Sequence, residues 1–165
     1  MKNVLFLCTG NSARSVLGES LMNELGKGRF RAFSAGSQPT GKPNPFAIEL
    51  LDGLGHDTSY IRSKSWDEFA GEDAPEMDYV ITVCSSAAGE TCPFWPGAPV
   101  SAHWGIPDPA GAGETDEENR QAFRVAFARM KARVDAFLAL PLDQMDTAAQ
   151  KAAMAKIGTE TEGAA

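Results

Sequence analysis

Residues 4–15 of the chain read VLFLCTGNSARS. The first four are apolar, and an uninterrupted apolar run is typical of a strand buried on both faces of a parallel sheet. The polar residues that follow predict a loop from Cys8 to Arg14. The next segment predicts a helix that ends at Gly26 and Gly28. The apolar positions of that helix are Val16, Leu17, Leu21 and Leu25. The chain therefore begins with a strand, a loop and a helix.

Strand and helix patterns alternate along the rest of the chain. Further strands are expected at residues 29–33, 78–83 and 99–103, and helices at residues 43–54 and 115–140. The last helix has apolar residues at alternating steps of four and three. They are Phe123, Phe127, Met130, Val134 and Phe137. This alternation favours an α/β fold with an open parallel sheet of about four strands flanked by helices, a Rossmann-like three-layer arrangement.

Length and charge limit the classes of function. The 165 residues suit one domain, expected over residues 1–140, followed by a C-terminal tail over residues 141–165 that is partly helical and then disordered. Fifteen basic residues against twenty-two acidic residues argue against binding to nucleic acid or to an anionic membrane. The apolar run near the N-terminus is too short for a signal peptide or a membrane span. We therefore expect a cytoplasmic protein, and a monomer.

The loop after the first strand has the composition of an oxyanion site. Backbone N–H groups in such a loop, at the start of a helix, converge on a tetrahedral anion. The residues expected to bind it are Thr9, Gly10, Asn11, Ser12, Ala13 and Arg14. Arg14 suits bidentate contact with two anion oxygens. The same positive field is expected to lower the pKa of Cys8, with a hydrogen bond from Ser15, and so to provide a reactive thiolate. The alternative is a buried structural cysteine.

The motif resembles the signature of low-molecular-weight protein tyrosine phosphatases and of the arsenate reductases derived from them. The resemblance covers about residues 3–140 and includes FSAGS at residues 33–37 and the pair Asp108–Pro109. It implies that Cys8 is the nucleophile, Arg14 the oxyanion-binding residue and Asp108 the general acid. Phosphatases of this family tend to carry a tyrosine after the Asp–Pro pair, whereas here Ala110 to Gly113 follow. A small inorganic oxyanion is therefore the better fit as substrate.

The other two cysteines favour the reductase. Cys84 directly follows the expected strand at residues 78–83, and Cys92 follows a segment of small residues. The resemblance implies that the first and third strands are neighbours, which would place Cys84 near Cys8, as in three-cysteine arsenate reductases. It implies a relay in which Cys8 binds arsenate, Cys84 attacks Cys8, and Cys92 attacks Cys84.

The relay implies an external thiol reductant, either thioredoxin or glutaredoxin with glutathione, and no catalytic cofactor. One alternative function is a phosphatase that works through a phosphocysteine and needs neither Cys84 nor Cys92. Another is a non-catalytic module that binds anions.

A structural potassium ion is a weaker expectation that also comes from the resemblance. Some reductase relatives hold such an ion, and the corresponding residues here are Asn11, Glu19, Ser34 and Asp67. The alternative is that Asn11 only hydrogen bonds within the loop and that Glu19 lies on a solvated helix face. Two distant histidines and the lack of a Cys-x-x-Cys pair give no support for zinc.

Overall fold

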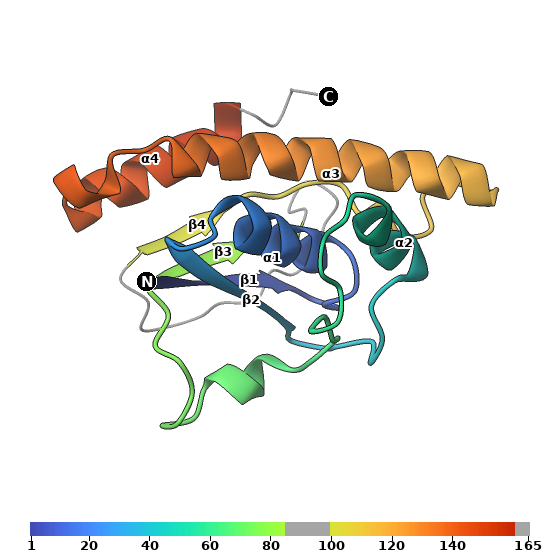
Figure 1. Ribbon diagram of the computed structural model, residues 1–165, viewed down its shortest axis with the longest axis horizontal. Helices are drawn as coiled ribbons and strands as arrows, with labels where there is room; N and C mark the ends of the chain where they lie inside the picture. Colours follow the sequence, from blue (N-terminus) through green and yellow to red (C-terminus); the bar gives the residue numbers. More distant parts are fainter. Residues whose placement is uncertain (85–99, 161–165) are drawn as a thin grey trace.

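The computed structural model describes residues 1–84 and 100–160, and its centre is a four-stranded parallel sheet in the order β2-β1-β3-β4 (Figure 1). The strands are β1 (Lys2–Cys8), β2 (Phe30–Gly36), β3 (Tyr79–Thr82) and β4 (Val100–His103). The predicted α/β fold with a parallel sheet of about four strands is confirmed. The prediction that the first and third strands are neighbours is also confirmed, since β1 pairs with β3.

Helices cover one face of the sheet. They are α1 (Arg14–Leu25), α2 (Pro45–Gly53), α3 (Asp116–Leu138) and α4 (Thr147–Glu160). The described residues also form the short 3₁₀ helices η1 (Trp66–Phe69) and η3 (Leu142–Gln144). A large apolar cluster joins this helical layer to β1 side chains such as Val4 and Phe6. Leu5 and Leu7 point to the other face, where the described part of the chain contributes Trp66 and Phe69 of η1. Because β1 is buried on both faces, its apolar run has no alternation.

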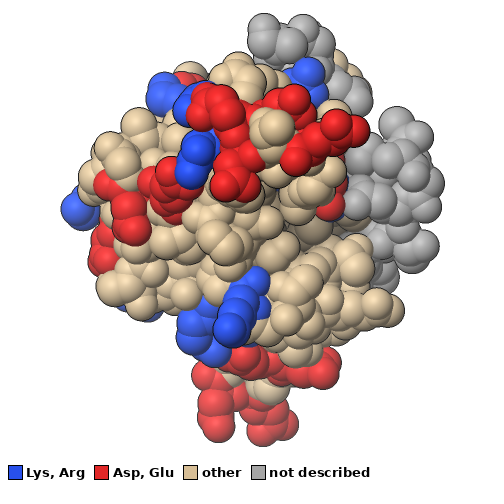
Figure 2. Space-filling view, turned by 90° about the vertical axis from the view of Figure 1, so that its right-hand side faces the viewer, with Lys and Arg blue, Asp and Glu red and all other residues tan. Residues whose placement is uncertain are grey.

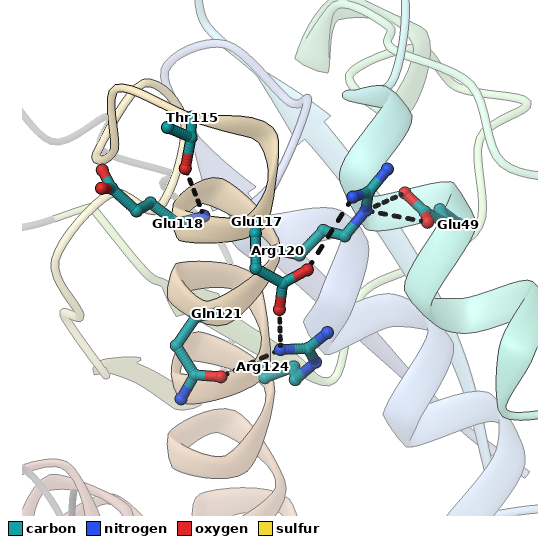
Figure 3. Close-up of polar contacts among 7 residues, drawn as sticks. All are labelled: Glu49, Thr115, Glu117, Glu118, Arg120, Gln121 and Arg124. Carbon is teal, nitrogen blue, oxygen red and sulfur yellow. Dashed lines mark hydrogen bonds and ion pairs between the residues drawn. The ribbon is translucent and has the colours of Figure 1, made fainter.

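The α3 helix follows the predicted periodicity closely. Phe123, Met130, Val134 and Phe137 are buried, and Phe127 is partly buried. The helix starts at a capping threonine, whose hydroxyl oxygen accepts a bond from the N–H of Glu118 (Figure 3). Arg120 pairs with Glu117 on its own helix and with Glu49 on α2. These exposed pairs add little stability individually, but they show how α2 lies against α3.

Strand β2 is longer than expected. The sequence predicted it over residues 29–33, whereas β2 pairs with β1 as far as Gly36, which lies opposite Cys8. The FSAGS motif is therefore the carboxyl end of this strand. Because parallel strands end at the same edge of a sheet, it brings Ser34 and Gly36 beside the Cys8 loop.

The C-terminal segment, expected to be a partly helical tail over residues 141–165, contains helix α4. Met154 and Ile157 of α4 belong to the same apolar cluster as the sheet. The indole N–H of Trp104 donates to the carbonyl oxygen of Met154 at 2.9 Å. In packing terms the core therefore continues past residue 140, because α4 lies against β4. The expected disorder falls on residues 161–165, outside the described residues. Among the described helices, none is long and apolar enough to span a membrane.

Candidate active site

The loop after β1 turns its carbonyl groups outward. The carbonyl oxygens of Thr9, Gly10 and Ser12 accept hydrogen bonds from the N–H groups of Gln38, Thr40 and Asn44, at 2.9, 3.0 and 2.8 Å. With the carbonyls satisfied on the outside, the loop N–H groups face its interior. Two of them, from Thr9 and Gly10, hydrogen bond to the sulfur of Cys8. Two N–H groups of the predicted nest, those of Thr9 and Gly10, are therefore directed at Cys8.

Asn11 fixes the curvature of the loop. It has a φ angle of 48°, the left-handed region that asparagine tolerates better than most residues. Its side-chain amide donates to Ser15 Oγ at 2.9 Å, and its side-chain oxygen accepts from the N–H of Lys64 at 2.9 Å. Because Ser15 Oγ accepts this bond, its own hydroxyl proton is free to bond elsewhere in the loop. Asn11 therefore ties the loop to helix α1 and to the segment before η1.

Arg14 and Asp108 meet over the same loop. The Arg14 side chain is buried, and its Nη1 donates to the carbonyl oxygen of Ile106 at 3.1 Å. Its Nη2 lies 3.6 Å from Asp108 Oδ2, and Asp108 Oδ1 accepts from the N–H of Ala110 at 3.0 Å. The Asp108 side chain is 45% exposed, so its carboxyl group stands at the solvent side of the site. The structure thus brings Asp108 to the loop that carries Cys8 and Arg14, although Asp108 is distant from both in sequence.

The pKa of Cys8 differs from the expectation. Cys8 is a free thiol, 4% exposed, and burial raises its pKa above the ordinary value. Arg14 and the two loop N–H groups act in the opposite direction, and the Asp108 carboxylate raises the pKa further. The predicted lowering was wrong, because desolvation of the thiolate outweighs the positive groups around it.

Cys84 lies at the end of the neighbouring strand. The N–H of Val83 still donates to the carbonyl oxygen of Leu7, so Cys84 follows at the same sheet edge as Cys8. Cys84 is fully buried and is disulfide-bonded, whereas Cys8 is not. The position expected for Cys84 is therefore correct in topology. Cys92 lies outside the described residues.

The residues expected to hold a potassium ion have other partners in the described part of the chain. Glu19 is 3% exposed, not on a solvated face, and accepts a bond from Ser34 Oγ at 2.7 Å. The buried Lys64 provides positive charge beside it. The side-chain oxygen of Asn11 is bonded to the Lys64 N–H, and Asp67 is exposed on η1. These oxygens already have protein partners and a nearby ammonium, so the donor set does not fit a potassium ion.

Glu19 gives the fold a pH dependence. Burial raises its pKa from 4.5 to about 7, with Lys64 and the Ser34 hydrogen bond opposing the shift. The folded protein therefore binds this proton more tightly than the unfolded chain does. The resulting stabilisation is present below about pH 4.5 and is lost as the pH rises to about 7, a change of about 3 kcal/mol.

We expect Glu19→Gln to remove this dependence. The free energy of unfolding of the wild type minus that of the variant should fall by about 2 to 3 kcal/mol between about pH 5 and about pH 8. Denaturant titrations at several pH values measure it. Glu72→Gln, at an exposed position, is the matched control and should show a flat difference. A flat difference for Glu19→Gln as well would contradict the prediction.

Three residues of the site region were not found from the sequence. Lys64 carries no local signal, because only its burial beside Glu19 gives it a role. Gly36 belongs to the FSAGS motif, but the motif does not indicate that a side chain at this position would collide with the carbonyl oxygen of Thr9. Arg133 did leave a signal, since it is a charged residue inside the apolar stripe of α3, and it is fully buried.

The protein has a net negative charge. Figure 2 shows Asp and Glu side chains gathered at the upper and lower margins of one face of the molecule, with smaller groups of Lys and Arg among them. The net charge of −7 gives no general attraction for an anion. Binding of an oxyanion therefore depends on the buried loop and on Arg14.

Comparison with known proteins agrees with this geometry. The model of the family described as low molecular weight phosphotyrosine protein phosphatase matches residues 3–151. An arsenate reductase of Halalkalibacterium halodurans is 35% identical over 136 residues, which are 82% of this chain and 94% of that protein. An arsenate reductase of Bacillus subtilis is 34% identical over 123 residues, 74% of this chain and 85% of that protein.

Solved structures show the same likeness. One described as an arsenate reductase in the phosphate binding state has a TM-score of 0.69 and 29% identity, and the match covers 84% of this chain and 98% of that one. The residues that the family model matches include the Cys8 loop, Arg14 and Asp108. This chain is therefore a member of the low molecular weight phosphotyrosine protein phosphatase family, of the arsenate reductase type.

Proposed function

We propose that the protein reduces arsenate to arsenite. Arsenate binds in the loop, where the inward N–H groups and Arg14 hold its oxygens, and the Cys8 thiolate attacks the arsenic. Asp108 protonates the oxygen that leaves, which yields a Cys8–arsenic adduct and water. The observation that carries this proposal is the convergence of the Cys8 sulfur, two loop N–H groups and the Arg14–Asp108 pair on one site.

The raised pKa of free Cys8 is compatible with this step. Burial and the Asp108 carboxylate favour the neutral thiol. Protonation of Asp108, which its role as an acid requires, removes the negative charge that opposes the thiolate. A substrate oxyanion can also accept the Cys8 proton as it binds. We therefore place deprotonation of Cys8 with substrate binding rather than before it.

The electrons come from two thiols. The Cys84 thiolate attacks the Cys8 sulfur, a Cys8–Cys84 disulfide forms, and the electron pair of the broken sulfur–arsenic bond leaves with arsenic as arsenite. Cys92 then attacks Cys84, which frees Cys8 and leaves a Cys84–Cys92 disulfide. The position of Cys84 just after β3, at the sheet edge where Cys8 ends β1, supports the first of these attacks.

An external dithiol then restores the enzyme. We propose thioredoxin as that reductant, with glutaredoxin and glutathione as the alternative. A thioredoxin-dependent arsenate reductase of Corynebacterium glutamicum has the same fold, with a TM-score of 0.58 and 23% identity. We also propose that the protein is cytoplasmic, because the relay requires a compartment in which thiols are kept reduced. We further propose that it is a monomer.

The alternative function is hydrolysis of phosphoesters, which the family name suggests. The loop after Asp108 gives it little support, since Ala110 to Gly113 offer no aromatic wall. The two tyrosines of the chain are engaged elsewhere. The Tyr79 hydroxyl donates to Gln150, and that of Tyr60 accepts from Asn23. A small inorganic oxyanion therefore fits the described part of the site better than an aryl phosphate.

The test is arsenate-dependent consumption of NADPH by the purified protein, coupled to either a thioredoxin or a glutaredoxin system. Consumption in one of them supports reduction and identifies the reductant. Disulfides trapped after one turnover are then mapped by mass spectrometry, with a Cys84–Cys92 bond expected. Fast hydrolysis of an aryl phosphate that survives a Cys84→Ser, Cys92→Ser double change, without arsenate-dependent consumption, would contradict the proposal.

A further inference from the structure

Arg133 is a fully buried arginine outside the loop that binds the oxyanion. It lies in the second half of α3, among the apolar side chains that pack on the sheet. Its Nη1 donates to the carbonyl oxygen of Trp104 at 2.8 Å and to that of Gly105 at 3.1 Å. A buried guanidinium is costly unless it is hydrogen-bonded, and these two bonds offset part of that cost. They also attach α3 to the segment that carries Asp108.

That segment, the acid loop (residues 103–109), is also held by Arg14. Arg14 Nη1 donates to the carbonyl oxygen of Ile106, directly after the two carbonyls that Arg133 binds. Three successive carbonyls of the acid loop therefore accept bonds from two guanidinium groups on different helices. Such charge-assisted bonds are stronger than neutral ones and fix the orientation of the peptide planes.

The N–H groups of the acid loop are anchored to the sheet. The N–H of Trp104 donates to the carbonyl oxygen of Thr82 at 2.7 Å, and that of Ile106 to Val83 at 3.3 Å. These bonds continue the hydrogen-bonded ladder between β3 and β4 past the end of β4. The two arginines bind the carbonyl oxygens of the same segment. Pro107 and Pro109 then restrict the backbone on either side of Asp108. A change in the orientation of the peptide planes at Gly105 therefore also changes the position of Asp108.

The acid loop also approaches the second cysteine closely. A side chain at Gly105 would place its Cβ 2.8 Å from the carbonyl oxygen of Cys84. The Gly105 backbone, which Arg133 holds, therefore lies against the backbone of Cys84 and belongs to the same loop as Asp108. Displacement of this backbone would disturb the site of protonation first, because Asp108 is only half buried and depends on the loop for its position.

We propose that Arg133 is a positioning residue for the general acid. It holds the carbonyl groups of Trp104 and Gly105 so that the Asp108 carboxyl group faces the oxyanion beside Arg14. Arg133 does not touch the substrate and acts through Asp108. This inference rests on the proposed function, since the position of Asp108 matters for turnover only where a leaving oxygen must be protonated.

The test compares Arg133→Met with Arg133→Lys. Methionine keeps much of the volume but cannot donate, whereas lysine can still bond to one carbonyl. For Arg133→Met we expect kcat for arsenate to fall about 10- to 100-fold, with KM changed less than about threefold, because the oxyanion is still held by the loop and Arg14. Arg133→Lys should recover part of this loss. Arg124→Met is the matched control, since Arg124 lies on the exposed side of the same helix and pairs with Glu117 (Figure 3).

The background of Asp108→Asn separates positioning from a general structural role. If Arg133 acts through Asp108, adding Arg133→Met to Asp108→Asn should change kcat less than about twofold. The same loss in both backgrounds, or an unchanged kcat in the single variant, would overturn the proposal. If Arg133→Met does not fold, Arg133→Lys carries the same comparison with a smaller expected effect.

Failure of the proposed function would be seen separately. A wild type that hydrolyses aryl phosphates but does not reduce arsenate would refute arsenate reduction, and the same pairs of variants would then be compared with an aryl phosphate, whose leaving oxygen also needs a proton. If the wild type has neither activity, amide hydrogen exchange tests whether Arg133 holds the acid loop in place. Equal exchange at the amides of Trp104 and Ile106 in Arg133→Met and Arg124→Met would refute the claim that Arg133 holds the acid loop, and faster exchange in Arg133→Met would show that it does hold the loop.

Discussion

Replacing Arg14 with lysine is expected to lower kcat/KM for arsenate about 100- to 1,000-fold, the usual cost of removing one preorganised oxyanion donor. The Arg14 guanidinium bonds to the Ile106 carbonyl and faces Asp108 while it presents N–H groups to the loop. Lysine is a single point charge on a flexible stem and cannot hold two oxygens and the acid loop together. The pKa of Cys8 should also rise, because the charge that now lowers it is displaced.

Steady-state kinetics and a pH titration of thiolate absorbance in the free enzyme measure these two effects. Arg62→Lys is the matched control, since Arg62 is exposed and pairs with Glu68. Its kinetics should match the wild type. Thermal unfolding of Arg14→Lys checks that the variant is folded. A folded Arg14→Lys enzyme with kcat/KM within about threefold of the wild type would show that Arg14 does not bind the oxyanion.

The second large effect is expected from Gly36→Ala. A Cβ at Gly36 would lie 2.4 Å from the carbonyl oxygen of Thr9 and 3.1 Å from the N–H nitrogen of Asn11, both backbone atoms of the oxyanion loop. The loop has to move, which turns its N–H groups away from a common centre. We expect affinity for inorganic phosphate to fall about 100-fold and the free energy of unfolding to fall by about 1 to 3 kcal/mol, as for other overpacked sites.

Calorimetric titration with inorganic phosphate measures the affinity, and denaturant titration measures the stability. Gly53→Ala is the control, because nothing lies within 4 Å of the Cβ that it would add. That variant should bind phosphate as the wild type does. Unchanged phosphate affinity in Gly36→Ala would mean that the loop binds the anion without the geometry described above.

Much of the fold and of the site was predictable because the signals are local. The apolar run of β1 requires burial on both faces, and the loop from Cys8 to Arg14 lies between that strand and a helix. The spacing of Phe123 to Phe137 determines the buried face of α3. In an open parallel sheet, strand ends share one edge, so the positions of Cys8 and Cys84 follow from their places after β1 and β3.

Other properties depend on residues that are distant in sequence. Lys64 is 53 residues from Asn11, and Arg133 is 29 residues from Trp104, so no local pattern predicts either bond. The pKa of Cys8 depends on a balance between burial and charge that composition cannot provide.

Sequence alone therefore determined the order of strands and helices and the chemical groups of the site, because periodicity and motif are properties of neighbouring residues. Only the tertiary structure decided which buried charges face each other, how far the thiol is desolvated and how α4 joins the core. Those quantities arise from packing between segments that the chain brings together only when it folds.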